Sequence, residues 1–159
     1  MELTYRRAEE ADAGLLVELY DRSFYEDFVK YGQCPAYGRT KERMEESIRR
    51  FPKEIVLCDG VPVGAISWEH RGGGQYYLGC LCVAPDYQNR GIGTQAVSYF
   101  RQTHPDWTRI ELITPADKIG NIHFYTQKCG FELINTAMDG DVKVVCLSLK
   151  RADDRAANH

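Results

Sequence analysis

The sequence contains no apolar run that approaches the roughly 20 residues needed to span a bilayer. The segment Met1–Arg7 also lacks the apolar core that a secretory signal peptide requires. These two absences predict a cytoplasmic protein that does not act at a membrane.

Neither positive nor negative charge is in large excess in the sequence. The 20 Lys and Arg residues nearly balance the 23 Asp and Glu residues, which leaves a formal net charge of −3. Proteins that bind nucleic acid need a concentrated basic surface to neutralise phosphates. The charge balance therefore argues against nucleic acid as a partner. A net charge of −3 is too small to indicate another kind of partner.

Cysteines at the spacing of a zinc site are also missing. The chain has six cysteines but no C-x-x-C pair, and the pair Cys80 and Cys82 alternates along a strand-like run. Cys58 and Cys146 likewise lie in apolar strand-like runs, where a free thiol behaves as a small hydrophobic group. The pattern predicts free thiols and no metal site.

The hydrophobic patterns predict one α/β domain over residues 1–150, followed by a flexible tail at 151–159. Strands are expected at 3–7, 54–58, 61–69, 76–83, 109–114, 131–135 and 142–149. Helices are expected after Asp12, after Thr40, at 93–103 and at 119–128. The strand–helix–strand segment from 76 to 114 is long enough for a right-handed parallel crossover.

The segment from Phe24 to Gly38 is aromatic and aperiodic, which predicts an irregular connection. A connection of this length inside a compact domain favours a functional role. It could form a wall over a bound group, with Glu26 and Asp27 available to pair with an amine. A packed surface loop is the equally open alternative.

A polar, glycine-bearing stretch, Asp86–Thr94, separates an expected strand from an expected helix. Gly91 and Gly93 allow a tight turn that exposes backbone amides, and the helix that begins there adds its own free amides. Arg90 places a positive charge nearby. Such a loop suits a diphosphate, although an ordinary glycine turn before a helix explains the same residues.

The spacing Gly91-x-Gly93-x-x-Ala96, with Glu111 further on, also matches the dinucleotide-binding fingerprint of a nicotinamide-dependent dehydrogenase. That fingerprint requires the strand to run directly into the first glycine. Here Pro85 and a polar stretch intervene, and Glu111 lies inside a strand instead of at its end. The dehydrogenase interpretation is therefore the weakest.

A better match is Gln88-x-x-Gly91-x-Gly93, preceded by the apolar Leu81-Cys82-Val83 and followed by Asn121–Tyr125 and Lys128–Phe131. This set resembles the coenzyme A loop, the preceding strand and the distal helix of the GNAT acetyltransferase superfamily. The resemblance implies a single mixed, mostly antiparallel sheet of six to seven strands flanked by helices. It also implies acetyl-CoA as co-substrate and an amine as acceptor.

The resemblance assigns a role to each matching position. Those implied to bind coenzyme A are Leu81, Cys82, Val83, Gln88, Asn89, Arg90, Gly91, Ile92, Gly93, Thr94, Asn121, Tyr125 and Lys128. Tyr125 matches the general acid that protonates the departing thiolate, and a phenol can do this while protonated at neutral pH. An aromatic core residue is the competing interpretation of Tyr125.

The general base departs from the family pattern, because Tyr77 stands where some members carry a glutamate. Glu69 is the first replacement candidate, with His70 beside it and Glu111 behind them; an amine of low pKa would need no base. The acceptor is expected to be a small-molecule or peptide amine, and a homodimer is compatible with the fold. A non-catalytic acyl-CoA sensor on the same fold is the alternative function.

Overall fold

The computed structural model describes residues 1–152 of the 159. Of the predicted tail, residues 153–159 lie outside the described part of the chain. Arg151 is held in place: its backbone amide donates to the Thr108 carbonyl, and its guanidinium donates to the carbonyls of Pro105 and Trp107.

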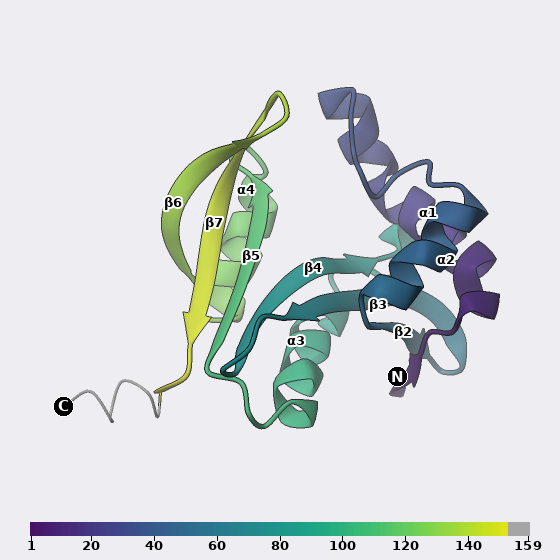
Figure 1. Ribbon diagram of the computed structural model, residues 1–159, viewed down its shortest axis with the longest axis horizontal. Helices are drawn as coiled ribbons and strands as arrows, with labels where there is room; N and C mark the ends of the chain where they lie inside the picture. Colours follow the sequence, from purple (N-terminus) through teal and green to yellow (C-terminus); the bar gives the residue numbers. More distant parts are fainter. Residues whose placement is uncertain (153–159) are drawn as a thin grey trace. The chain divides into compact units, whose positions relative to one another are not determined.

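The chain forms two compact units, which are described separately. The first comprises Met1–Glu69 with Gly79–Ala96, and the second comprises His70–Leu78 with the chain from Val97 onward. The strands form a seven-stranded sheet of order β1-β2-β3-β4-β5-β7-β6 (Figure 1). Only the β4–β5 pairing among those assigned is parallel, which confirms the expected mixed, mostly antiparallel sheet.

Antiparallel strands build the sheet of the first unit. They are β1 (Leu3–Arg7), β2 (Lys53–Cys58), β3 (Val61–His70) and the second half of β4 (Gln75–Val83). The hairpin between β2 and β3 turns at Asp59 and Gly60, both with positive φ, as the Asp-Gly pair predicts. The register shifts between Val56 and Leu57, and Leu57 then lies opposite Pro62, which cannot donate a ladder hydrogen bond.

Helix α1 (Ala13–Tyr31) is longer than the sequence predicted. It includes about half of the segment that was expected to be irregular, and the chain leaves the helix only at Gly32, which has a φ of 70°. Tyr37 then folds back and stacks on Phe28 with ring centroids 4.6 Å apart. The aromatic residues therefore pack along a helix and its return segment, and Glu26 and Asp27 lie on the helix itself.

The start of α1 also differs from the expectation. A short 3₁₀ turn, Glu10–Asp12, precedes the helix, and the Asp12 side chain does not cap α1. Its carboxylate instead accepts hydrogen bonds from the Arg6 guanidinium and from the Glu9 amide. These bonds hold the pKa of Asp12 below its usual value, with the Arg6 hydrogen bond as the main cause.

Helix α2 (Lys41–Arg50) begins as predicted, because the Thr40 hydroxyl accepts a hydrogen bond from the Arg43 amide at 3.1 Å. Its Met44 is completely buried. It joins a hydrophobic cluster in which α1, α2 and the strands meet, with Leu16, Leu19, Tyr20, Ile55 and Cys82 among its members.

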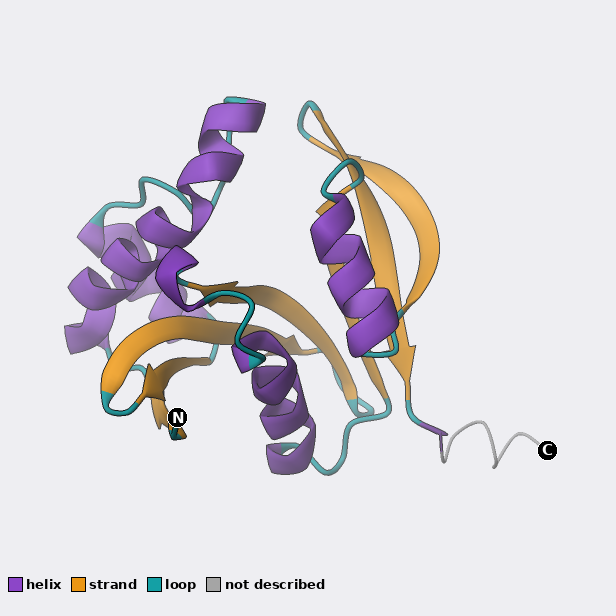
Figure 2. Ribbon diagram, turned by 180° about the vertical axis from the view of Figure 1, so that it is seen from behind, coloured by secondary structure: helices purple, strands orange, loops and turns teal. Residues whose placement is uncertain are grey.

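Helix α3 (Ile92–Thr103) connects the units in sequence, and the remaining elements belong to the second unit. They are β5 (Arg109–Pro115), α4 (Ile119–His123), β6 (Glu132–Asp139) and β7 (Val142–Lys150). A π-helical segment, Phe124–Lys128, continues α4 directly, and Figure 2 shows this helix beside the strands of the second unit. The parallel ladder joins Gln75–Tyr77 of β4 to Arg109–Glu111 of β5, which confirms the crossover.

Candidate functional site

The loop after β4 is anchored to the end of that strand. Pro85–Tyr87 form one 3₁₀ turn, and the exposed Gln88 then donates from Nε2 to the Val83 carbonyl at 3.0 Å. The resemblance had assigned Gln88 to cofactor binding. In the structure its side chain bonds to the chain itself, so it shapes the loop.

Two residues in left-handed conformations turn this loop into α3. Asn89 has a φ of 64° and Gly91 a φ of 81°. A Cβ built at Gly91 would approach only the Gln95 side chain, at 3.9 Å, so the space beside this glycine is open. Gly91 is therefore needed for its backbone conformation, and it leaves one side of the loop uncovered.

The first amides of α3 follow at once. The Gln95 amide is the first to bond back into the helix, to the Gly91 carbonyl at 3.1 Å. By helix geometry, the amides of Ile92, Gly93 and Thr94 have no acceptor within the helix, and the helix dipole is positive here. Arg90 adds a full charge, with its guanidinium 5.1 Å from the centre of the Tyr87 ring. The loop has the donors and the charge to hold a diphosphate.

Strand β4 carries the preceding candidates, Leu81, Cys82 and Val83. On one edge its backbone lies very close to β3: a Cβ added at Gly64 would clash with the Cys82 carbonyl oxygen. The Ala84 amide also donates to the Val63 carbonyl at 2.7 Å. Because β3 occupies this edge, a strand-like ligand would have to pair with the opposite edge of β4.

In the second unit, Asn121 and Tyr125 lie on the helix after β5. Asn121 donates from Nδ2 to the Thr114 hydroxyl at 3.3 Å. Tyr125 is 8% exposed, and its ring lies edge-on to Phe124 and to Phe131. Tyr125 is thus packed among aromatic rings, at the position where the resemblance implies the general acid.

The helix changes from α to π at Phe124, a feature that the sequence did not reveal. The wider π turn alters the four-residue spacing that would otherwise place Asn121 and Tyr125 directly above one another. The Phe131 amide donates to the Tyr125 carbonyl at 2.9 Å, and Gly130, at a φ of 82°, supplies a left-handed residue after the helix. His123 and Lys128 on the same helix are exposed.

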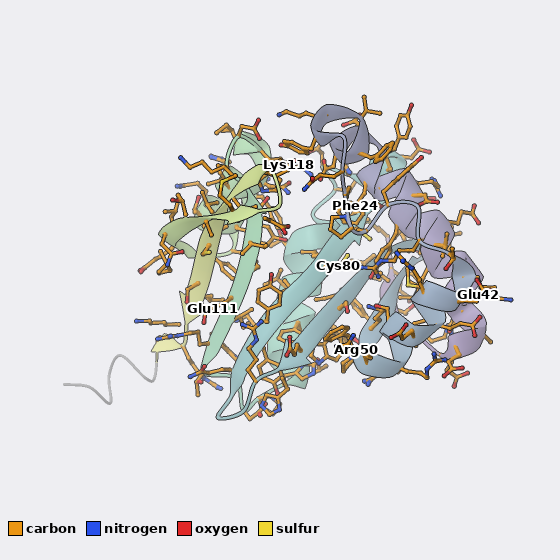
Figure 3. The ribbon with its side chains drawn as sticks, turned by 45° about the horizontal axis from the view of Figure 1, so that its top comes forward. Phe24, Glu42, Arg50, Cys80, Glu111 and Lys118 are labelled. Carbon is orange, nitrogen blue, oxygen red and sulfur yellow. The ribbon has the colours of Figure 1, made fainter. Side chains whose placement is uncertain are left out.

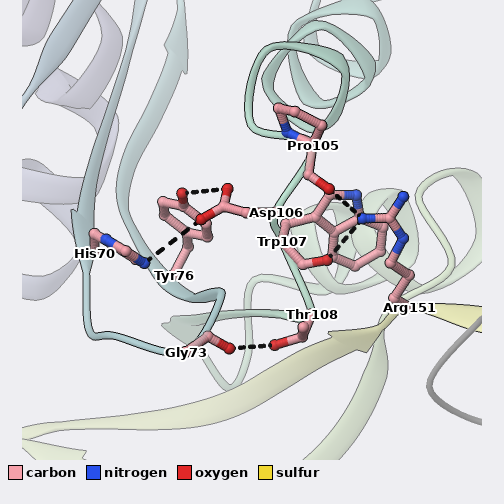
Figure 4. Close-up of polar contacts among 8 residues, drawn as sticks. All are labelled: His70, Gly73, Tyr76, Pro105, Asp106, Trp107, Thr108 and Arg151. Carbon is pink, nitrogen blue, oxygen red and sulfur yellow. Dashed lines mark hydrogen bonds and ion pairs between the residues drawn. The ribbon is translucent and has the colours of Figure 1, made fainter.

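Of the candidate bases, His70 is engaged in a polar and aromatic cluster (Figure 4). Its ring stacks on Tyr76 at 4.5 Å, and its Nε2 lies 3.9 Å from the Asp106 carboxylate. The Tyr76 hydroxyl donates to the same carboxylate at 2.8 Å. Burial first, and this hydrogen bond second, raise the pKa of Tyr76 to about 12. These contacts fit a structural role for His70.

The other candidate positions are half-buried. Glu69 lies near the end of β3. Tyr77, in the place of the family glutamate, pairs in register with Glu111 and carries the Arg71 guanidinium 4.3 Å from its ring centre. The assignment of Glu69 as the base stays a prediction.

Within the described residues, no group of His, Cys, Asp and Glu side chains has the arrangement of a metal site, and no helix is long and apolar enough to cross a membrane. All six cysteines are free thiols.

The mixed sheet and the glycine-bearing loop between β4 and α3 are the features that the sequence resemblance implies. The chain belongs to the acetyltransferase (GNAT) family, whose sequence profile matches residues 15–131.

Known proteins share this fold at low sequence identity. An acetyltransferase from Thermus thermophilus superposes with a TM-score of 0.78 at 19% identity, over 95% of this chain and 98% of that one. The PaiA N-acetyltransferase from Thermoplasma acidophilum, in complex with coenzyme A, gives 0.77 at 17% identity, over 95% and 100%.

By sequence, the chain is 34% identical over 80 residues to YrkN, an uncharacterized protein of Bacillus subtilis strain 168. The match covers 50% of this chain and 43% of YrkN, so the chain spans less than half the length of this relative.

Proposed function

We propose that this protein is an N-acetyltransferase that transfers the acetyl group of acetyl-CoA directly to an amine. The observation that carries the proposal is the loop Gln88–Thr94. Its left-handed Gly91 leaves open space beside the free amides of α3. The loop directly follows β4, whose assigned pairs with β5 are Gln75–Tyr77. Family membership and the fold of coenzyme A-binding relatives support it.

The residues present fit coenzyme A. The amides from Asn89 to Thr94 and the Arg90 charge would hold the pyrophosphate, and the backbone of Leu81–Val83 would pair with the amide-rich pantetheine arm. Asn121 and Lys128 are proposed as further contacts. When bound, acetyl-CoA supplies an activated acetyl thioester.

We propose Tyr125 as the general acid that gives its phenolic proton to the departing thiolate sulfur. Glu69 would remove a proton from the acceptor amine, directly or through one water, because only the neutral amine is nucleophilic. We also propose that residues 1–150 form one N-acetyltransferase domain and that the protein acts in the cytoplasm, where its six free thiols would persist. The acceptor would be a small molecule or a peptide; neither nucleic acid nor a membrane is proposed as a partner.

The test is an acetyl-transfer assay in which purified protein, acetyl-CoA and a panel of amines are analysed by mass spectrometry for acetylated product and by thiol release for free coenzyme A. Both products should appear together for at least one class of amine. Tight binding of acetyl-CoA without transfer to any amine would instead identify the acyl-CoA sensor.

A further inference from the structure

In the first unit, one face of β4 meets α1 and α2 in a group of polar side chains. Figure 3 shows Cys80 on this face, with Phe24 of α1 nearby. We call this group the donor cluster; its members are Tyr20, Ser23, Arg39, Lys53, Ser67 and Cys80. None of its members is a carboxylate.

Lys53 is the most unusual member, because it is a lysine that is only 3% exposed. Its Nζ donates to the Ser67 hydroxyl at 2.9 Å, and that hydroxyl donates in turn to the Pro52 carbonyl. No carboxylate lies within ion-pair distance of Lys53 in the described residues. Burial is the main cause that lowers the pKa of Lys53, to about 8. A buried cation without an anion is costly, and proteins normally pair such a charge.

A second cation, Arg39, lies close to the first. Its guanidinium is 5.5 Å from the centre of the Tyr20 ring and donates to the Ser47 hydroxyl and to the Pro35 carbonyl. It likewise has no carboxylate partner in the described part of the chain. The charge on Arg39 contributes to the lowered pKa of Lys53, so the two cations repel each other across the cluster.

Tyr20 supplies a buried hydroxyl that lacks a partner. The side chain is 1% exposed, and neither its hydroxyl nor that of Ser23 makes a hydrogen bond within the described residues. Burial raises the pKa of Tyr20, and the neighbouring thiols of Cys80 and Cys82 raise it further. A buried hydroxyl of this kind is normally satisfied by a bound group or a water molecule.

The thiol of Cys80 does not balance the positive charges of Lys53 and Arg39. Its thiol pKa is lowered, chiefly by a hydrogen bond from Cys82 and then by Tyr20, Lys53 and Arg39. Even as a thiolate it would neutralise only one of the two cations. With Cys80 as a thiolate, the donor cluster would still carry one positive charge without a partner.

The position of the cluster indicates which anion it would bind. The loop Gln88–Thr94 follows the carboxyl end of β4. A pantetheine arm that pairs with β4 from Val83 back to Leu81 would therefore have its acyl end near Cys80. Cys80 and Arg39 are both half-buried, so they are the members of the cluster that solvent reaches. The cluster thus lies beside the place where the acetyl group would be offered.

We propose that Lys53, Arg39 and Tyr20 bind a carboxylate of the acceptor, so that the substrate is an amine that also carries a carboxylate, such as an amino acid. This inference rests on the proposed acetyltransferase function and narrows its acceptor. Lys53 and Arg39 supply the charge, and the Tyr20 hydroxyl supplies a directed hydrogen bond.

The experiment compares matched acceptors, each protein amino acid against its carboxamide, with acetyl-CoA as donor. We expect kcat/KM for the preferred acid to exceed that for its amide by about tenfold or more, the size of one charged hydrogen bond. Lys53→Met and Arg39→Gln should bring this ratio close to one, mainly through KM. The control Lys41→Met, which changes an exposed lysine of α2, should leave it unchanged.

Equal use of acids and amides by the wild-type protein would overturn the carboxylate site while leaving the acetyltransferase function intact. So would a preference that survives in both variants. Arg39→Gln alters a half-buried side chain, so the comparison remains available if Lys53→Met does not fold.

A second readout needs no turnover. Propionate should raise the unfolding temperature of the wild-type protein more than propionamide does, and this difference should disappear in Lys53→Met or Arg39→Gln. Equal shifts with the two compounds in the wild-type protein would contradict the proposal, whether or not any amine is acetylated.

Discussion

The loop after β4 and the helix that carries Tyr125 achieve their proposed roles in different ways. The loop acts through backbone: left-handed Asn89 and Gly91, the first amides of α3 and the edge of β4. The helix acts through side chains, and one atom, the Tyr125 oxygen, carries the proposed chemistry. A site built from backbone tolerates most side-chain changes but not a lost glycine. A site built from side chains loses its function when one atom is removed and can keep its affinity.

The largest effect is expected for Gly91→Val. Valine at a φ of 81° is strained, and its side chain would fill the open space beside the amides of α3. Calorimetry should detect no binding of acetyl-CoA by a protein that still unfolds cooperatively. Gly60→Val is the matched control, since Gly60 has a φ of 83° in the β2–β3 hairpin and lies in open space. Unchanged affinity in Gly91→Val would refute the loop assignment.

The next effect concerns stability at Lys53. The folded state lowers the pKa of this lysine from 10.5 to about 8, so the unfolded chain holds more protons between these values. Stability should therefore rise as the pH increases through this window, and the full shift corresponds to about 3 kcal/mol. Denaturant titrations of wild-type protein and Lys53→Met at pH 7.5 and 10.5 should show this rise in the wild type alone. A parallel pH dependence in the two proteins would mean that Lys53 titrates normally.

Tyr125→Phe should lower kcat about a hundredfold and leave the affinity for acetyl-CoA within about twofold, since only the proton donor is lost. Steady-state kinetics and calorimetry on one preparation separate the two effects. Tyr25→Phe, at a residue that is 55% exposed, should change neither quantity. Equal turnover by Tyr125→Phe at neutral pH would leave the tyrosine as a core aromatic.

The smallest effect is expected for Gln88→Ala. It removes the hydrogen bond from Nε2 to the Val83 carbonyl, a contact that shapes the loop and is worth about 1 kcal/mol. Affinity for acetyl-CoA should fall about fivefold, by calorimetry. A loss as complete as that of Gly91→Val would show that the Gln88 side chain contacts the cofactor itself.

The sequence predicted features that depend on local backbone chemistry. The Asp59-Gly60 hairpin, the Thr40 cap and the turn at Gly91 follow from residues that favour one conformation, and all three are present. The length of α1 was missed because aromatic residues obscure helical periodicity, and the packing of Phe28 against Tyr37 is a tertiary contact. The π segment at Phe124 has no recognisable signal in residue spacing.

The donor cluster was missed for a different reason. Lys53 was placed outside the strand, although strand alternation puts it on the same face as the buried Ile55. Extending the strand by one residue would have revealed a lysine at a core position. Arg39 and Tyr20 come from distant segments, and their approach depends on the tertiary fold.

The measurement that tests the central claim most directly is a calorimetric titration of the wild-type protein with acetyl-CoA, desulfo-CoA and NADH in parallel. We expect both coenzyme A compounds to bind with similar affinity and NADH not to bind. All three carry a diphosphate, but only the coenzyme A compounds carry the pantetheine arm that the β4 edge is proposed to bind. Binding of NADH in place of the coenzyme A compounds, or no binding of either by folded protein, would contradict the assignment of this loop and with it the proposed acetyltransferase.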